Sequence, residues 1–284
     1  MGSDLHQTAR RLRNLVEPLA AGVYFAPEAQ QRYGDQGLNY FEGYFCSRGA
    51  CLGRAPWRVI CAAFGAFKPA VVEQAVTGGW AKTDPEPLLE ARLAGATDQL
   101  TRLLGEPGPE VKEATEILFS LTDGVDPSGR MLYSGLSVLP VPDTPYGRLW
   151  RAADLVREHR GDSHIAAWIS HADSCEITVL TELTWGLQPG AYVFTRGWSE
   201  EEVDAARDRL RARGLLDDDN QLTEAGKSFR GEIEHATDLA EREVIDRLGD
   251  HTDELFSLIQ PMAKAIVDGG GYPVDFTKLR GTRG

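Results

Sequence analysis

The chain has few cysteines and no long apolar segment among its 284 residues. The cysteines show no Cys-x-x-Cys spacing, so we expect reduced thiols in a core rather than a disulfide framework; they are Cys46, Cys51, Cys61 and Cys175. The longest run of only apolar residues and glycine, Val59 to Phe67, is far too short to span a bilayer. The first residues are charged and lack the apolar region of a secretory signal. We therefore expect a soluble, cytoplasmic protein with no membrane partner.

Signature motifs and positive charge are also lacking. There is no P-loop, G-x-G-x-x-G, G-x-S-x-G or H-E-x-x-H sequence, so the common nucleotide, serine-hydrolase and zinc-protease signatures are excluded. The formal charge is −13; residues 1–147 carry 13 basic and 17 acidic side chains, and residues 148–284 carry 17 and 26. The second half is therefore the more acidic one, which disfavours binding to nucleic-acid phosphates.

Apolar and aromatic residues are plentiful enough for a folded core. The chain is 42% hydrophobic and holds six Trp, eight Tyr and ten Phe, which excludes a disordered protein. Strong strand alternation is missing from the first half, which predicts an all-α structure there. Apolar spacing and proline positions predict helices at residues 4–23, from Pro27, at 39–49, 56–67, 69–75, 88–104 and 110–121.

The segment 39–49 concentrates aromatic side chains on one helix face. Asn39 is the expected N-cap, and Arg48 continues the row that starts with Tyr40 and Tyr44. Such aromatic density is typical of an ordinary core. The alternative is an aromatic-lined pocket with Tyr24, Tyr44 and Arg48 as its polar points.

The segment 157–164, Arg-Glu-His-Arg-Gly-Asp-Ser-His, gathers two histidines, an acid and arginines around a glycine. We predict a helix over 147–159, a break at Gly161, and a second helix over 163–171. The break would place His164 in the first turn of the second helix.

The second half shows a different succession of elements. We expect a helix over 174–185 with Ser174 as its cap, and a Ser199-to-Glu202 capping box ahead of a helix that ends before Gly214. Residues 215–222 read as a two-stranded wing with an acidic tip. A long helix from Thr223 to about Leu248 and a final helix over 250–267 follow.

The helices, the Arg-Gly-Leu-Leu sequence, the wing and Leu-Thr-Glu-Ala-Gly together resemble the winged-helix domain of MarR-type regulators over residues 148–250. The whole chain resembles an actinobacterial family of helix-turn-helix proteins, which share segments like 24–28, 44–48 and 159–164. The MarR resemblance makes the 223–248 helix and the final helix candidates for a homodimer interface.

DNA binding through this domain is disfavoured by its charges. In a winged helix the N-terminal residues of the recognition helix meet bases and phosphates. Here those positions hold Glu200, Glu201, Glu202 and Asp204, and the wing tip is Asp-Asp-Asp at 217–219. The arginines between 207 and 213 come late in the helix, and we expect them to pair with nearby acids. We therefore expect a scaffold that does not use DNA, since fold does not fix function.

Four interpretations of segment 157–164 stay open. In the first, its charges form structural ion pairs and caps. In the second, His164, oriented by Asp162 and aided by His159, performs acid–base chemistry. In the third, His159 and His164 hold a metal or haem, and in the fourth the segment binds a ligand without chemistry. Arg196 would need a carboxylate partner or an anionic ligand if buried.

We predict a mainly α protein. A helical, aromatic-rich domain (residues 1–146) would pack on a degenerate winged-helix domain (residues 147–284) with a small β-wing and C-terminal helices. A small molecule would bind between the halves, with no resident cofactor, held by Tyr24, Tyr44, Arg48, Arg160 and Arg196. Our first function hypothesis is an acid–base hydrolase, lyase or isomerase; the alternatives are a MarR-like ligand-responsive regulator and a metal or haem enzyme.

Overall fold

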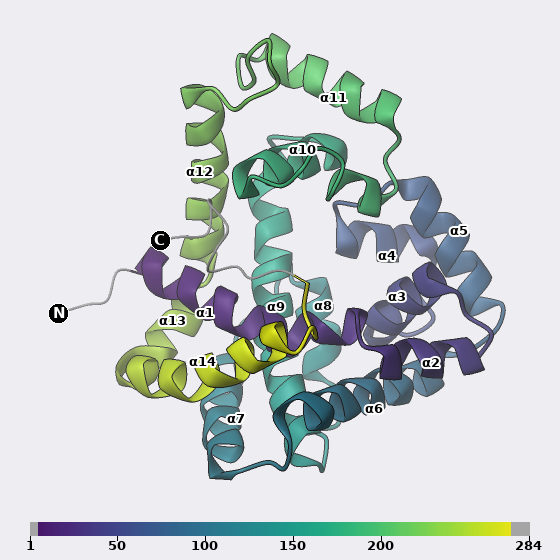
Figure 1. Cartoon of the computed structure of the whole chain (residues 1–284), viewed down its shortest axis with the longest axis vertical. Helices are drawn as coiled ribbons and strands as arrows, with labels where there is room; N and C mark the ends of the chain where they lie inside the picture. Colours follow the sequence, from purple (N-terminus) through teal and green to yellow (C-terminus); the bar gives the residue numbers. More distant parts are fainter. Residues whose placement is uncertain (1–4, 274–284) are drawn as a thin grey trace.

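A computed structural model describes residues 5–273, and within that range the protein is built almost entirely of helices (Figure 1). The α-helices are α1 (Leu5–Ala21), α2 (Pro27–Asp35), α3 (Tyr40–Gly49), α4 (Trp57–Phe64), α5 (Pro69–Trp80), α6 (Pro85–Leu104), α7 (Pro109–Thr122), α8 (Met131–Ser137), α9 (Pro145–Trp168), α10 (Ser174–Trp185), α11 (Glu200–Ala212), α12 (Glu224–Ala240), α13 (Arg242–Leu248) and α14 (Thr252–Asp268). Short 3-10 helices lie at η1 (Gly22–Tyr24), η2 (Ala50–Leu52), η3 (Val193–Arg196) and η4 (Gly249–His251). The prediction of a mainly α fold is confirmed.

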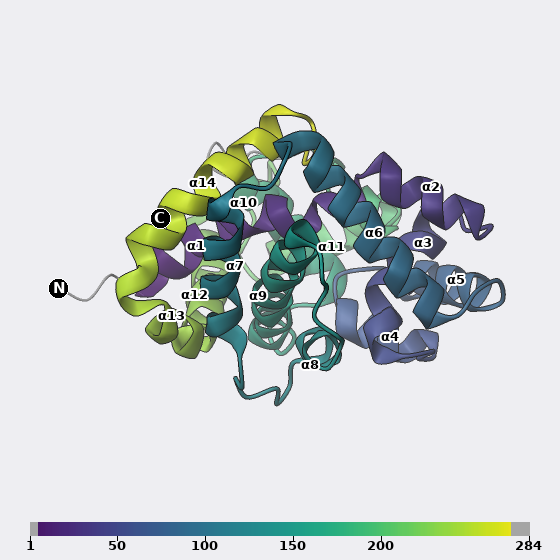
Figure 2. The same cartoon turned by 90° about the horizontal axis from the view of Figure 1, so that it is seen from below.

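Helix α9 is the central element of the molecule. Helices α1, α6, α7, α8 and α12 all pack against it, and Figure 2 shows α9 enclosed between α7, α8 and α6. Because neighbouring helices cover most of it, α9 buries charged residues as well as apolar ones, among them Asp154, Glu158 and Arg160. Buried charges need partners, so the surrounding helices must supply them.

Two main apolar cores lie beside this region, and a third, small cluster joins the end of α9 to α10 and α12 around Trp168 and Ile233. The larger one joins helices α1 to α8, the first half of α9, and helices α13 and α14. A smaller one joins α10, η3, α11 and the hairpin after α11 through residues such as Leu180, Val203 and Leu210. The α10–α11 unit is thus packed around its own core.

Most predicted helix starts are confirmed at the level of their caps. Asn39 and Ser199 each form a capping box, with Glu42 and Glu202 as the returning carboxylates. The predicted cap Ser174 is wrong by one residue. Asp173 is the N-cap of α10, since its carboxylate accepts from the backbone amides of the next two residues, whereas Ser174 is the first helical residue.

The predicted break at Gly161 is wrong, since α9 continues through it to Trp168. A glycine inside a helix costs only about 0.5–1 kcal/mol, and the burial of the residues before and after Gly161 outweighs that cost. His164 therefore lies in the interior of α9 rather than in the first turn of a new helix.

The predicted β-wing is also wrong: within residues 5–273 there is no strand, and residues 215–222 form a hairpin with a single bridge between Leu216 and Leu222. Asp217 turns the chain sharply, because its carboxylate accepts from the amides of Asp219 and Gln221. Asn220 adopts a left-handed conformation with φ 58°. Because residues 217–221 form this turn, they cannot extend the strand pairing.

The long helix predicted from Thr223 to Leu248 is interrupted at Glu241, where α12 ends and α13 begins. Helix α14 lays its apolar face on α1, α6 and α7 inside the chain. The predicted boundary between residues 146 and 147 falls in the first turn of α9, and both the two-domain division and the homodimer stay predictions. None of the described helices has the length and apolar character needed to cross a membrane.

Candidate functional site

The middle of α9 carries a buried ion-pair network with α1 and α3. Arg48 makes two contacts with Glu158, at 2.8 Å from Nε to Oε1 and 2.6 Å from Nη2 to Oε2. Arg157 joins Glu158 at 2.7 Å and Glu17 at 3.0 Å. Burial alone would raise the pKa of Glu158, but Arg48 and Arg157 outweigh it and lower that pKa to about 2. Glu158 is therefore a fixed negative charge.

The predicted pocket residues Tyr24 and Tyr44 lie behind Arg48. Their rings are 4.9 Å apart at an edge-on angle, and Arg48 Nη1 donates to the Tyr44 hydroxyl at 3.3 Å. Arg92 donates to the Tyr24 hydroxyl at 2.8 Å and pairs with Asp154 at 2.7 Å. Both tyrosine hydroxyls thus accept hydrogen bonds from arginines that pair with buried carboxylates of α9.

His159 and Arg160 turn toward α12 and the residue that follows it. Nδ1 of His159 lies 2.8 and 3.0 Å from the two carboxylate oxygens of Glu241. Arg160 Nη2 contacts Asp238 at 2.7 Å and Glu234 at 3.1 Å. These partners are more than seventy residues away in sequence.

The structure does not bring Asp162 to His164. Asp162 accepts from the backbone amide of Tyr133 in α8 at 3.0 Å, and burial raises the pKa of this carboxyl to about 7. His164 instead places Nδ1 3.0 Å from the hydroxyl of Thr237 in α12. The catalytic roles of His164, Asp162 and His159 stay predictions, but the orienting contact expected between the first two is absent.

Burial lowers the pKa of His164 to about 3, and nearby Arg230 adds to the effect. The imidazole is therefore neutral at ordinary pH. The Thr237 hydroxyl lies within hydrogen-bond distance of both His164 Nδ1, at 3.0 Å, and the Ile233 carbonyl, at 2.8 Å.

A cavity of about 180 Å³ lies between the helical body and the α10–α11 unit. Arg48, Arg160 and His164 line it, and their roles in binding a ligand stay predictions. The remaining lining residues are Ala9, Leu12, Arg13, Val16, Glu17, Val156, Arg157, Gly161, Thr181, Trp185, Tyr192, Arg230, Glu234, Glu241 and Ile245. They come from α1, α9, α10, α12 and α13 and from the segment before η3.

Several predicted site residues lie elsewhere. Tyr24, Tyr44, His159 and Asp162 are not among the lining residues of the cavity. Arg196 lies at the end of η3, where its guanidinium stacks at 4.2 Å from the ring of Tyr192 and 4.8 Å from that of Phe67, and donates to Thr195. A carboxylate partner or an anionic ligand was expected for Arg196 only if it is buried; it is partly exposed, and aromatic faces accompany its guanidinium.

Sequence reasoning missed the residues of α1 and α12 that complete the cavity. Arg230 and Glu234 stand four apart, and this spacing on an expected helix was the one available signal. Nothing local in the sequence shows that α12 crosses the middle of α9.

Metal-ligating side chains do not gather in the described part of the chain. No group of three or more His, Cys, Asp or Glu residues between residues 5 and 273 has a geometry that could hold a metal ion. Whether the protein carries a metal or haem through His159 and His164 stays a prediction.

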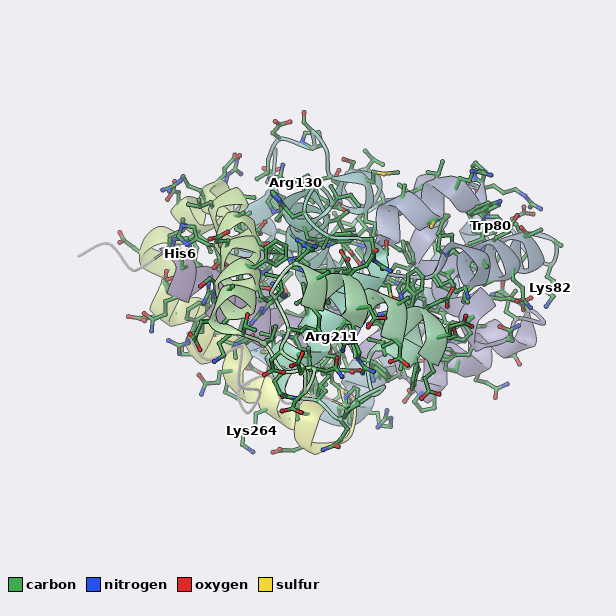
Figure 3. The ribbon with its side chains drawn as sticks, turned by 90° about the horizontal axis from the view of Figure 1, so that it is seen from above. His6, Trp80, Lys82, Arg130, Arg211 and Lys264 are labelled. Carbon is green, nitrogen blue, oxygen red and sulfur yellow. The ribbon has the colours of Figure 1, made fainter. Side chains whose placement is uncertain are left out.

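The α10–α11 unit has the charge arrangement that we expected. Glu200, Glu201 and Asp204 are exposed near the start of α11. All four arginines between 207 and 213 form ion pairs with carboxylates: Arg207 with Asp204, Arg209 with Asp173 and Glu176, Arg211 with Asp208, and Arg213 with Glu176. Figure 3 labels Arg211 on α11.

The connection between α10 and α11 spans residues 186–199, much longer than the three or four residues of a standard helix-turn-helix turn. Part of it is held by Glu182 of α10, whose carboxylate accepts from the backbone amides of Gly190, Tyr192 and Val193. The loop is therefore tied to α10 as one body.

Of three comparisons with known proteins, one yields a match. Neither the curated proteins nor the solved structures contain a match to this chain. One family model, described as a helix-turn-helix family, matches residues 9–273. That match includes the first helices and α14 as well as the α10–α11 unit, so the chain belongs to this helix-turn-helix family.

Proposed function

We propose that this protein is a helix-turn-helix regulator that responds to a small molecule bound in the cavity beside α10. Membership of a helix-turn-helix family supports DNA binding over the enzyme hypothesis. The observation that carries the proposal is the composition of the cavity wall: Thr181 and Trp185 of α10 and Tyr192 form one side of it. The order of elements after α9, similar to that in MarR-type regulators, agrees with this function.

The packing offers a way for the ligand to act on α11. Helices α10 and α11 share the small apolar core, whereas Arg160 and His164 on α9 belong to the central body. A ligand that fills the cavity contacts both bodies at once. If the ligand binds one spacing between α9 and α10 more tightly, it shifts the population toward that spacing and so changes the position of α11. The size of the population shift is set by the difference in its affinity for the two states.

A second candidate function has one observation in its favour. The exposed start of α11 carries Glu200, Glu201 and Asp204, and carboxylates at that position repel phosphates. A protein that binds a small molecule without using DNA, including an acid–base enzyme, would account for them. As the acid or base of such an enzyme His164 is poorly matched, because a pKa of about 3 lies far from neutrality.

Fluorescence anisotropy separates the two candidates. The full chain is titrated into a labelled duplex taken from upstream of its own gene and into a scrambled duplex, at low and at physiological salt. A regulator gives saturable binding that weakens with salt and prefers the upstream duplex. Absence of binding to both duplexes at low salt would rule out the regulator and leave the second candidate.

A further inference from the structure

We propose that the cavity takes a small organic monocarboxylate, with its head group between Arg160 and Arg230 and its apolar body against α1 and α10. The proposal deepens the function above and rests on it only in treating the cavity as a ligand site. It starts from atoms that lack partners. Arg160 Nη1 and Arg230 Nε and Nη1 are buried and have no hydrogen-bond partner.

Both arginines are almost fully enclosed, at 8% and 3% exposed, and both line the cavity. A buried guanidinium nitrogen without an acceptor is costly, and its geometry suits a planar carboxylate. Two such side chains that line one cavity call for an anion.

The charge balance of the cavity wall points the same way. Five arginines but only three glutamates line it: Arg13, Arg48, Arg157, Arg160 and Arg230 against Glu17, Glu234 and Glu241. Glu158 and Asp238 lie behind the wall and pair with Arg48, Arg157 and Arg160, which brings the carboxylates to five, but Asp238 also serves Arg10 at 2.8 Å.

The deficit is sharpest at Glu234. This one carboxylate serves Arg230 at 2.7 Å, Arg160 at 3.1 Å and Arg13 at 3.4 Å. Burial lowers the pKa of Arg13 to about 10 even with Glu234 beside it, and Arg160 contributes to that lowering. A second carboxylate, brought by a ligand, would complete the set.

The neutral groups of the wall limit the ligand to one negative charge and a compact body. His164 is neutral, so it adds no positive charge that could bind a second anionic group. Apolar side chains also line the cavity, namely Leu12, Val16, Val156, Trp185 and Ile245. The volume of about 180 Å³ is close to the roughly 150 Å³ of an apolar cavity that holds one benzene.

The test uses isosteric probes on the full chain without DNA. Isothermal titration compares cyclohexanecarboxylate with the neutral cyclohexanecarboxamide, the cationic cyclohexylmethylamine, and acetate, which has the head group alone. We expect the carboxylate to bind about tenfold to a hundredfold more tightly than the amide, the value of a charge-assisted contact, and the amine and acetate to bind more weakly still. Equal affinity for acid and amide, or no heat with the acid at millimolar concentration, would overturn the proposal.

Two variants locate the head group. Arg230→Gln should weaken cyclohexanecarboxylate at least about tenfold and leave the amide unchanged. Arg247→Gln is the matched control, because Arg247 pairs with Glu243 at the same four-residue spacing but lies outside the cavity. Equal losses in both variants would overturn the assignment, and if Arg230→Gln does not fold, the comparison of isosteres on the unmodified protein decides alone.

The failure of this proposal is distinguishable from failure of the regulator. Carboxylate binding without any DNA binding would contradict the regulator hypothesis and support the anion site. DNA binding without carboxylate binding would contradict the anion site and support the regulator hypothesis.

Discussion

His164 is held neutral by its burial and by the arginines that surround it. In the unfolded chain a histidine takes up a proton near pH 6.5, but in the folded protein the pKa of His164 is about 3. Between these values the unfolded state binds more protons, so the contribution of His164 to stability is lost as the pH falls from about 6.5 toward 3. His164→Gln should flatten this part of the stability curve.

Urea unfolding of both proteins at pH 7 and pH 5 measures this effect. The unmodified protein should lose more stability than the variant over that interval. Identical losses would mean that His164 is protonated in the folded state. Proton NMR of the imidazole adds an independent check, since its C–H resonances should not titrate between pH 5 and pH 8.

The residue scale is also where sequence reasoning reached its limit. The segment 157–164 was recognisable as a polar cluster, and Arg48, Arg160 and His164 do line one cavity. The contact expected between Asp162 and His164 was assigned from closeness in sequence. On one continuous helix, residues two apart point about 200° from each other, so each finds its partner on a different neighbouring helix.

At the scale of elements, Gly161 shows how packing overrides a local signal. The sequence predicts a break there, but α9 stays helical because the residues on both sides of Gly161 pack against other helices. The caps at Asn39 and Ser199 were predictable, since a capping box is made by residues three apart. The β-wing was not, since the turn at Asp217 depends on side-chain contacts within the hairpin.

Gly161→Ala tests the continuity of α9. A Cβ at this position would meet only Glu158 Oε2, at an ordinary 3.4 Å. Alanine is favoured over glycine inside a helix, so the variant should gain about 0.5–1 kcal/mol of unfolding free energy. Gly95→Ala in α6 is the matched control and should lose stability, since its Cβ would lie 2.6 Å from the backbone of Ala29. A loss of stability in Gly161→Ala would argue for strain or a break in α9.

The charge on α11 gives a prediction about DNA at the same scale. Replacing the exposed Glu200 and Glu201 by glutamine removes two repulsive charges from the start of the helix. If α11 approaches the duplex, anisotropy at low salt should show non-specific affinity rising several-fold. The matched pair Glu86→Gln and Glu90→Gln, exposed on α6, should leave affinity unchanged. Equal effects of the two pairs would place the contact away from α11.

At the scale of the whole molecule, α9 ties early and late parts of the chain together. It packs against α1, α6, α7 and α8 on one side of the sequence and against α12 on the other, while α14 returns to cover α1, α6 and α7. These long-range contacts have no local sequence signal. This explains why the helices themselves were predictable and their arrangement around α9 was not.

Calorimetry tests whether this interleaving makes one cooperative unit. A division at residues 146 and 147 predicts two folding units, whereas a helix shared by both parts predicts one. We expect a single transition with equal calorimetric and van't Hoff enthalpies. The unfolding enthalpy should be near 190 kcal/mol, from about 0.7 kcal/mol for each of residues 5–273. Because α10 and α11 have their own small core, an early separate transition would most naturally belong to them. Its appearance would show that the unit beside the cavity unfolds, and therefore moves, independently of α9.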